Sequence, residues 1–357
     1  MKKNYDIVYL TNTPSFYKLN LCEALSRRGI RLLIVFNGYG SEAVNSRLDQ
    51  DSDWSFDWRS LFEGDYWQRP KLTIYKRLLH LMSSIEARKV IFSGWMSTEY
   101  NLYSFFSPRK KNVMICESSR FEVDVTGLKG CIKRRLIHRM SAALPSGTPH
   151  RELLEYMGFK GPQFITGSVG IINTDHTEDK LPVKQRIHRV ITNGPKFLYV
   201  GRLTAVKNLE ILIECFNRNG LPLTIAGSGE LENDLKSRAN PNITFLGFIE
   251  NKNLGEIYKQ HDVFILPSYS ETWGLVVEEA MSRGVPVIVS DVVGSGPDMA
   301  VATGAGLTFK HNSVSSLQNA IEQIQSNYNK FVEATAAIDF DARRESQINA
   351  YIKALNN

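Results

Sequence analysis

The chain of 357 residues is 43% hydrophobic and 22% charged, an ordinary globular composition whose length suits two domains better than one. The sequence has no run of 18 apolar residues, no signal-peptide pattern and no CxxC pair among its four cysteines. These absences argue against membrane spans, secretion, a disulfide framework and a zinc site, so a cytoplasmic protein with reduced, mostly buried thiols is predicted.

Short apolar runs alternate with longer amphipathic stretches along the chain, which is the pattern of helices packed on parallel sheets. In the first half the expected strands are residues 6–11, 31–36, 89–94, 112–117 and 141–146. The expected helices there are residues 15–28, 72–86, 97–106, 130–140 and 149–157. Residues 39–68 are rich in Asp, Ser and Trp without clear periodicity, and are predicted to form an irregular insertion or a mobile loop.

Residues 176–194 are polar, weakly periodic and interrupted by Pro and Gly, which predicts a domain boundary. The alternation then restarts, with strands expected at residues 196–201, 221–227, 242–247, 262–268, 286–291 and 306–309. The predicted fold class is α/β, with two doubly wound, Rossmann-like domains facing each other across a cleft. The domains are expected over residues 1–180 and 190–340, with a C-terminal helix at 341–357 packing back on the first.

Positive charge is concentrated in the N-terminal half. Residues 1–175 hold 25 Lys and Arg against 17 Asp and Glu, whereas residues 176–357 hold 18 against 20. The basic clusters at 69–82, 107–112 and 129–140 are either solvated helix faces or a surface that attracts anionic lipid or a phosphorylated acceptor. Nucleic acid is disfavoured because aromatic residues do not interleave with the basic ones. A peripheral position at the inner face of the plasma membrane is the corresponding expectation.

Residues 267–291 (PSYSETWGLVVEEAMSRGVPVIVSD) predict a buried strand end, a polar turn and an apolar helix that begins near Trp273 or Gly274 and ends at Arg283-Gly284. The first N–H groups of this helix, in residues 272–276, form an anion site suited to a diphosphate. Glu271 and Glu279 bracket the helix start, about 12 Å apart if the interval is helical, which is roughly the span from hexose to ribose in a nucleotide sugar. The alternative is that Glu271 only caps the helix and Glu279 is a surface residue.

Residues 199–216 (YVGRLTAVKNLEILIECF) carry two cations at the end of a strand. Arg202 stands beside Gly201, and Lys207 precedes an amphipathic helix that starts near Asn208. A departing diphosphate needs charge stabilisation and close backbone approach, which these residues supply. Taken alone, an Arg and a Lys before a helix are also consistent with solvated charges.

Together these stretches resemble the retaining GT-B enzymes of glycosyltransferase family 4. The shared features are Gly201-Arg202-Leu203, Lys207-Asn208, the GSGE turn at 227–230, ITFLGFI at 243–249 and the E-x7-E pattern from Glu271 to Glu279. The match covers about residues 196–310. Trp273 stands where most members of the family have Phe.

The resemblance implies that Arg202 and Lys207 bind the diphosphate, Glu271 the transferred sugar and Glu279 the ribose, while the backbone at 247–248 meets the base. It implies that Glu271, Arg202 and Lys207 are the catalytic set, without a metal or other cofactor. The donor-binding residues expected in this way are Gly201, Arg202, Lys207, Gly247, Phe248, Glu271, Thr272, Trp273, Gly274, Leu275 and Glu279. Front-face displacement would leave positioning and electrostatics as the contribution of the protein.

The N-terminal half resembles a subgroup of bacterial polysaccharide glycosyltransferases. The turn after its first strand, TNTPSFYKLN at 11–20, has a proline and no glycine, and the missing GxGxxG argues against a dinucleotide oxidoreductase. Ser15, Trp95 and Glu117 are the expected acceptor-side residues, although a cap or salt-bridge role is equally open for Glu117. His150 is expected to be structural or helix-capping. The triplet at 51–53 (DSD) resembles the DxD metal motif of another transferase fold and is discounted, because it does not follow a predicted strand.

These features predict transfer of a hexose or N-acetylhexosamine from a nucleotide diphosphate sugar, expected to be a UDP-sugar, to a growing surface glycan. The acceptor expected from the subgroup is a lipid-linked O-antigen or capsule repeat, or lipopolysaccharide. Two alternatives stay open: a sugar-nucleotide epimerase on a similar fold, and a non-catalytic nucleotide-sugar-binding or membrane-adaptor protein.

Overall fold

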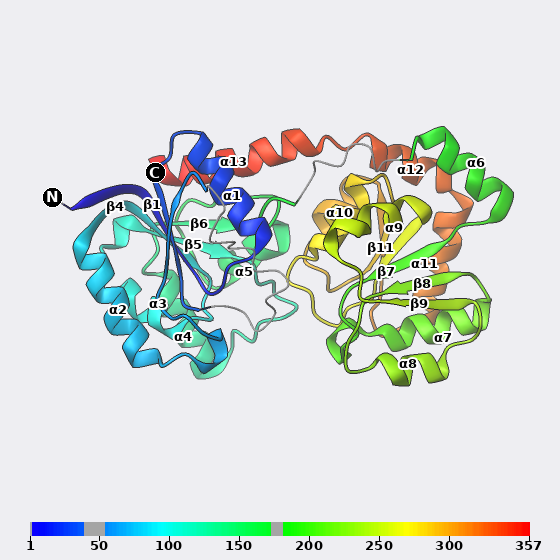
Figure 1. Ribbon diagram of the computed structural model, residues 1–357, viewed down its shortest axis with the longest axis horizontal. Coiled ribbons are helices and arrows are strands. Elements are labelled where there is room, and N and C mark those ends of the chain that lie inside the picture. Colours follow the sequence, from blue (N-terminus) through cyan, green and yellow to red (C-terminus); the bar gives the residue numbers. More distant parts are fainter. Residues whose placement is uncertain (1, 39–53, 173–180) are drawn as a thin grey trace. The chain divides into compact units, whose positions relative to one another are not determined.

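The computed structural model describes residues 2–38, 54–172 and 181–357 of the chain (Figure 1). These residues form two compact units. Unit 1 consists of Met1–Asn173 together with Asp341–Asn357, and unit 2 consists of Thr174–Phe340. Each unit is an α/β structure built on its own parallel sheet, so each is described by itself.

The described part of unit 1 contains a six-stranded parallel sheet in the order β3-β2-β1-β4-β5-β6. Its strands are β1 (Lys3–Thr11), β2 (Leu32–Phe36), β3 (Asp57–Ser60), β4 (Ile85–Ser93), β5 (Asn112–Cys116) and β6 (Ala142–Pro145). Its helices are α1 (Phe16–Arg27), α2 (Lys71–Ser84), α3 (Thr98–Phe106), α4 (Gly127–Ile137) and α5 (Thr148–Tyr156), with 3-10 turns η1 (Tyr66–Gln68) and η2 (Arg109–Lys111). The first strand is central and the order reverses beside it, as in doubly wound folds.

The two faces of this sheet bury two separate apolar clusters, because successive side chains of a strand point to opposite faces. Val8 and Leu10 of β1 pack with residues of α2, α3 and α5. Ile7 and Tyr9 pack with residues of α1 and of the C-terminal helix α13 (Phe340–Asn356). Helices therefore cover both faces, and the strand ends stay available for a site.

Polar contacts as well as apolar ones join α13 to unit 1. Arg28, directly after α1, pairs with Glu345, and the guanidinium of Arg343 donates to the carbonyl of Gly167 at 3.0 Å. The amide of Gln347 donates to the carbonyl of Ser168 at 3.2 Å. The last seventeen residues thus pack against the unit that begins the chain.

The described part of unit 2 contains a six-stranded parallel sheet in the order β12-β11-β10-β7-β8-β9. Its strands are β7 (Phe197–Val200), β8 (Leu223–Ala226), β9 (Ile243–Gly247), β10 (Val263–Leu266), β11 (Val287–Ser290) and β12 (Gly306–Phe309). Its helices are α6 (Val183–Asn193), α7 (Leu209–Asn219), α8 (Glu232–Arg238), α9 (Leu254–Gln260), α10 (Leu275–Ser282), α11 (Val314–Ser326) and α12 (Tyr328–Ala336). Shorter turns are η4 (Ala205–Lys207), η5 (Asn251–Asn253) and the π-helical η6 (Gly296–Val301). Both sheets have the same doubly wound order, which confirms the predicted fold class.

The strands expected in both halves are confirmed to within a few residues. The irregular insertion expected over 39–68 is wrong at residues 57–60, which form β3 and pair in parallel with β2. This strand has the sequence DWRS, whose polar residues give no strand signal, and it gains its place from pairing with the apolar β2. The rest of the expectation for 39–53, including the DSD triplet at 51–53, lies outside the described residues.

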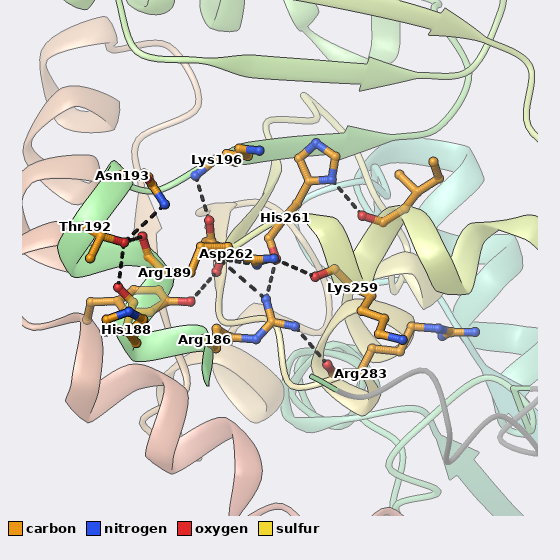
Figure 2. A network of polar contacts seen from close by, with 12 residues as sticks. Arg186, His188, Arg189, Thr192, Asn193, Lys196, Lys259, His261, Asp262 and Arg283 are labelled. Carbon is orange, nitrogen blue, oxygen red and sulfur yellow. Dashed lines mark hydrogen bonds and ion pairs between the residues drawn. The ribbon is translucent and has the colours of Figure 1, made fainter. Parts of the chain in front are cut away.

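The polar segment expected as the boundary holds helix α6 over its second half. Its Arg186 is fully buried, and the guanidinium donates to the backbone carbonyls of His261 and Arg283 (Figure 2). Arg189 donates from Nε to the buried carboxylate of Asp262 at 2.9 Å, and Asp262 also accepts from the backbone N–H of Lys196 at the same distance. Val183, Ile187 and Val190 recur at helical spacing in this segment, so the expectation of weak periodicity is wrong over residues 183–193.

Among the described residues, no helix combines the length and the apolarity needed to cross a lipid bilayer.

Candidate functional site

The candidate site lies at the carboxyl edge of the sheet of unit 2, between β7 and β10. Strand order reverses there, since β8 and β9 follow β7 on one side, and β11 and β12 follow β10 on the other. Open α/β sheets bind ligands at such a switch point because the flanking loops diverge. The loops involved are residues 201–208 after β7 and residues 267–274 after β10.

The two loops meet in an ion pair between Lys207 and Glu271, which are 64 residues apart in the chain. Each side chain is only 15% exposed. The hydroxyl of Ser268, at the end of β10, donates to the same carboxylate at 3.4 Å. A cation suited to phosphate and a carboxylate suited to sugar hydroxyls therefore stand side by side at the switch point.

Arg202 lies in the same loop, with an exposed side chain. Its backbone carbonyl accepts from the hydroxyl of the buried Tyr199 at 2.9 Å, which fixes the turn. Desolvation raises the pKa of Tyr199 well above its usual range, and the nearby charge of Glu271 adds to this rise while Arg202 opposes it. Tyr199 is thus a neutral buried hydroxyl beneath the two charged residues that the sequence assigned to the donor.

Asn208 holds Lys207 in place, whereas the sequence marked it only as a helix start and as part of the shared Lys207-Asn208 pair. It has φ of 54°, the single positive φ of a non-glycine residue in the described part of the chain. Its side-chain amide donates to the carbonyls of Pro267 at 3.0 Å and His311 at 2.8 Å. Asn tolerates the left-handed region better than most residues, so an Asn directly before an amphipathic helix was the available signal.

The GSGE turn at 227–230 contains glycines because it packs closely on the loop after β7. A Cβ on Gly227 would lie 1.8 Å from the carbonyl oxygen of Gly201, and a Cβ on Gly229 would lie 2.4 Å from that of Leu203. The backbone N–H of Gly227 also donates to the carbonyl of Gly247 at 2.7 Å. The loops after β7, β8 and β9 are therefore in backbone contact, and no side chain fits between them.

The loop before α10 is held from the far side of the switch point. Helix α10 begins at Leu275, close to the predicted start, and Gly274 before it has φ of 88°. The backbone N–H of Gly294 donates to the carbonyl of Glu271 at 3.0 Å, and that of Ser295 donates to Trp273 at 3.1 Å. The segment after β11 thus fixes the position of Glu271.

Trp273 and Glu279 both turn out to be buried. The indole of Trp273, 1% exposed, donates to the carboxylate of Glu278, so its ring fills the core instead of the sheet edge. Glu279 is 8% exposed and accepts from the hydroxyl of Tyr258 at 3.4 Å. Burial raises the pKa of Glu279, and the charge of Arg283 opposes that rise. The alternative of a surface Glu279 is wrong.

At the end of β9, Gly247 has φ of 69° and Phe248 is 58% exposed. Position 247 therefore requires a residue that enters the left-handed region at little cost. Phe248 is one of the two residues expected to meet the base, and its ring is exposed there.

The acceptor-side residues expected in unit 1 are associated with different faces of its sheet. Ser15 is the N-cap residue of α1, and Glu117 follows β5 and pairs with Lys18 of α1 at 3.5 Å. Trp95, after β4, packs against the α2–α3–α5 core cluster, and the Nζ of Lys133 lies 5.5 Å from its ring centroid. Ser15 and Glu117 are thus linked through α1, whereas Trp95 belongs to the opposite face.

Histidine and cysteine residues show no reactive cluster in the residues that the structure describes. His150 is fully buried and its carbonyl accepts from the thiol of Cys116 at 3.9 Å, which fits the expected structural role. Three of the four cysteines are buried and Cys131 is exposed. Residues 2–38, 54–172 and 181–357 contain no group of three His, Cys, Asp or Glu side chains that could hold a metal ion. Independence from metals stays a prediction.

Comparison with known proteins places unit 2 in a family. Residues 182–338 match the family model described as glycosyl transferases group 1. The chain is 40% identical over 126 residues to an uncharacterized glycosyltransferase of Methanocaldococcus jannaschii, which covers 33% of this chain and 32% of that protein. It is 31% identical over 159 residues to the UDP-Gal:α-D-GlcNAc-diphosphoundecaprenol α-1,3-galactosyltransferase of Escherichia coli, covering 41% and 40% respectively. The matches span between a third and two fifths of the length of these curated relatives.

The structure resembles solved glycosyltransferases over almost the whole chain. Anabaena HepE in complex with UDP-glucose superposes with a TM-score of 0.67 and 15% identity, covering 98% of this chain and 99% of that one. Two six-stranded Rossmann-like domains, together with the similarity to solved glycosyltransferases, define the GT-B fold. Within that fold, the chain carries a glycosyl transferases group 1 domain at residues 182–338.

Proposed function

We propose that this chain is a retaining glycosyltransferase of family 4 that transfers a hexose or N-acetylhexosamine from a nucleotide diphosphate sugar to a growing surface glycan. The observation that supports this most directly is the Lys207–Glu271 pair at the β7/β10 switch point, with Arg202 in the same loop. These residues combine what the two halves of a sugar diphosphate need, cations for phosphate and a carboxylate for hydroxyls.

In the proposed reaction the diphosphate binds Arg202 and Lys207, and the released Glu271 carboxylate accepts hydroxyls of the transferred sugar. The acceptor oxygen bonds to the anomeric carbon on the face from which the phosphate oxygen leaves. The acceptor proton passes to that leaving oxygen, so no protein base and no metal is required. Arg202 and Lys207 then stabilise the charge of the departing diphosphate, and the fixed loops supply orientation.

A UDP-sugar is the proposed donor. Anabaena HepE, a fold neighbour, is described in complex with UDP-glucose, and the matched Escherichia coli enzyme is named for UDP-Gal. Glu279 is proposed to hold the ribose, with the backbone at 247–248 near the base. Glu279 is buried and hydrogen-bonded to the hydroxyl of Tyr258. It would therefore bind the ribose as a fixed carboxylate, not as a mobile surface group.

The proposed acceptor is a lipid-linked O-antigen or capsule repeat, or lipopolysaccharide, met at the inner face of the plasma membrane. Exposed apolar side chains on α3 and α4 support this: they are Leu102, Phe105, Phe106, Leu128 and Ile132. The segment after α4 contacts the end of α3, since the Arg139 guanidinium donates to the carbonyls of Ser104, Phe105 and Ser107. Apolar residues beside cations are typical of interfacial helices.

The cations of α4 differ in exposure and in their contacts. Lys129 and Arg135 are exposed. Lys133 donates to the carbonyl of Asp124 at 2.9 Å, and Arg134 donates to that of Val125 at 3.0 Å, so both are engaged in holding the loop before α4. We define Leu128, Lys129, Ile132 and Arg135 as the α4 surface.

A binding screen followed by a product assay tests this function. UDP- and GDP-sugars should raise the melting temperature, because a ligand that binds only the folded state stabilises it by mass action. Mass spectrometry of the best donor incubated with and without glycan acceptor should show transfer only when acceptor is present. A change of the donor alone into an isomeric sugar nucleotide would favour an epimerase instead, and binding without any turnover would favour a non-catalytic role.

A further inference from the structure

A network of bonds beside the candidate site of unit 2 involves residues that the expected donor contacts do not include. It centres on His311, two residues after the end of β12, and on Asp291, directly after β11. It also includes the loops after β7 and β10. These four strands are neighbours in the sheet, so the network joins four adjacent strand ends.

One oxygen of the Asp291 carboxylate binds His311 at two points. Oδ1 accepts from the backbone N–H of His311 at 3.0 Å and lies 2.8 Å from Nδ1 of its ring. A carboxylate anion only accepts, so the ring nitrogen carries the hydrogen of the second bond. These two bonds restrict the main chain at residue 311, and with it the direction of the carbonyl of His311.

That carbonyl is one of two acceptors for the buried amide of Asn208. Nδ2 of Asn208 donates to it at 2.8 Å and to the carbonyl of Pro267, after β10, at 3.0 Å. The amide has two hydrogens, so both are used in a residue that is 3% exposed. If the carbonyl of His311 moved away, a buried donor would lose its partner, which costs free energy.

The same amide compensates for the unusual backbone of Asn208. Its φ of 54° lies in the left-handed region, which a residue with a Cβ adopts stably only when its surroundings offset the strain. This conformation lies directly after Lys207, where turn η4 ends and helix α7 begins. A change to negative φ would redirect the chain there, so the position of Lys207 depends on the Asn208 amide.

A further contact connects this network to the loop that carries Glu271. The backbone N–H of Tyr269 donates to the carbonyl of Val206 at 2.8 Å, which joins the loop after β10 to the loop after β7. The rings of Tyr269 and His311 meet edge-on, with centroids 5.9 Å apart and planes at 82°. Tyr269 stands two residues before Glu271, so both loops of the ion pair are held close to their charged residues.

We propose that Asp291 and His311 are positioning residues for the proposed reaction, and that they act through Asn208 on Lys207. The proposal rests on the proposed function, because it assigns Lys207 to the departing diphosphate. The network fixes the ammonium where the leaving charge develops, before any donor binds. A charge that is already in place stabilises the transition state without rearrangement at the moment of reaction.

Two other roles for these residues make a different prediction. The side chain of His311 is 32% exposed, so it would be accessible if it contacted the donor directly. The bonds between Asp291 and His311 would otherwise serve only to join the ends of β11 and β12. In both cases a substitution would act independently of Lys207. A double-mutant cycle separates these roles from positioning, because substitutions along one chain of contacts are not additive.

The experiment measures kcat and KM of the full chain and its variants with the best donor from the nucleotide-sugar screen. Asp291→Ala and His311→Ala remove the contact. Asp291→Asn keeps an acceptor oxygen, and His311→Asn keeps a side-chain N–H near the position of Nδ1. Asn208→Gly keeps the left-handed backbone without the amide, because glycine enters that region at little cost. Each substitution is also combined with Lys207→Ala, and melting temperatures identify any variant that fails to fold.

Asp234→Ala and His188→Ala are the matched controls. Asp234 is an exposed residue of α8 that pairs with Arg238 at 3.3 Å, and His188 is exposed on α6. Both belong to unit 2, and neither stands in a loop of this network. They should leave kcat and KM unchanged.

Asp291→Ala, His311→Ala and Asn208→Gly are each expected to lower kcat about ten-fold, because a small displacement of a positioned group lowers the rate strongly. KM should change less, since the lost stabilisation belongs to the charge of the transition state. Asp291→Asn and His311→Asn should retain most of the activity. In the Lys207→Ala chain, the same substitutions should change kcat by less than about two-fold.

Equal losses of kcat in the wild-type and Lys207→Ala chains would overturn the proposal. Wild-type kinetics of folded Asp291→Ala and His311→Ala variants would overturn it as well. Failure of the proposed function gives a different result, because the wild-type protein would then turn over no nucleotide sugar.

A second cycle tests the same contacts without any donor. Urea unfolding of Lys207→Ala, Glu271→Ala and the double variant measures the coupling between the two charges. Positioning predicts that this coupling is smaller in the Asp291→Ala chain than in the wild type. An unchanged coupling would show that Asp291 does not act on Lys207.

Discussion

The two units share a strand order and a lysine–carboxylate pair at the carboxyl edge, yet the two pairs differ in kind. In unit 2, Lys207 and Glu271 are in direct contact, and each side chain is 15% exposed. In unit 1, Lys18 and Glu117 stand 3.5 Å apart, and the lysine also bonds Thr11. In unit 2 the ammonium and the carboxylate are hydrogen-bonded to each other. In unit 1, Oε1 of Glu117 is buried without a hydrogen bond.

This difference follows from the position of each lysine in its secondary structure. Lys207 lies in a loop whose backbone is fixed by the left-handed Asn208, so its ammonium reaches the neighbouring strand end directly. Lys18 lies inside the first turn of a helix, and its ammonium is shared between two strand ends. The first arrangement suits exchange of a carboxylate for phosphate, whereas the second ties α1 to the ends of β1 and β5.

The largest expected effect comes from removing the cations of unit 2. Arg202→Ala or Lys207→Ala should cost about 2–4 kcal/mol in kcat/KM for the donor, because a developing phosphate charge loses a partner. Lys207→Ala also leaves Glu271 without its ion pair, so the comparison predicts the greater loss there. Steady-state kinetics with the donor varied checks this, with Lys236→Ala of α8 as a control. Near-wild-type activity of both variants would remove the diphosphate assignment.

The next effect tests whether unit 1, not unit 2, meets the membrane. Lys129→Gln with Arg135→Gln on the α4 surface should weaken binding to anionic liposomes by about 2 kcal/mol, at about 1 kcal/mol for each charge. Binding should fall with salt, since the Debye length is about 8 Å at physiological ionic strength. Cosedimentation measures it, and Lys236→Gln with Lys252→Gln in unit 2 is the control. Equal losses from both pairs would mean that the attraction is not specific to unit 1.

A smaller effect distinguishes the two glutamates of unit 2. Glu271→Gln should lower kcat about ten-fold or more, because in the proposed reaction its carboxylate touches the sugar as the bond breaks. Glu279→Gln should mainly raise the KM for the donor, since ribose contacts are alike in ground and transition states. A ribose-free sugar phosphate should be insensitive to the second change. The reverse pattern of kcat and KM would reverse the orientation of the donor.

The smallest effect concerns stability. Burial raises the pKa of Glu279 above that of an unfolded chain, so the folded state holds the proton more tightly. The resulting stabilisation is complete below the unfolded pKa of about 4.3 and is lost as pH rises through the folded pKa. Glu279→Gln should therefore raise the melting temperature near pH 7.5 more than near pH 4. Glu256→Gln, an exposed position on α9, should show no such difference.

The sequence predicted those parts of the molecule whose signal is local. Apolar runs located the strands, and the Gly284–Pro286 stop marked the end of α10. Helix α6 was missed because its apolar residues stand among many polar ones between Pro182 and Gly194, and β3 was missed because its residues are polar. At the site, glycines and charges were visible in the motifs. The burial of Glu279 and the pairing of Lys18 with Glu117 were not, because both depend on residues distant in the chain.

The fluorescence of the buried Trp273 can report on the candidate site of unit 2. The sequence holds five tryptophans, and Trp273 alone lies between residues 174 and 340. It sits two residues after Glu271, and its ring nitrogen donates to Glu278 at the start of α10. Replacing the other four tryptophans with phenylalanine would leave one fluorophore in the loop after β10. Its emission would then follow occupancy of the proposed nucleotide site in real time, separately from any event in unit 1.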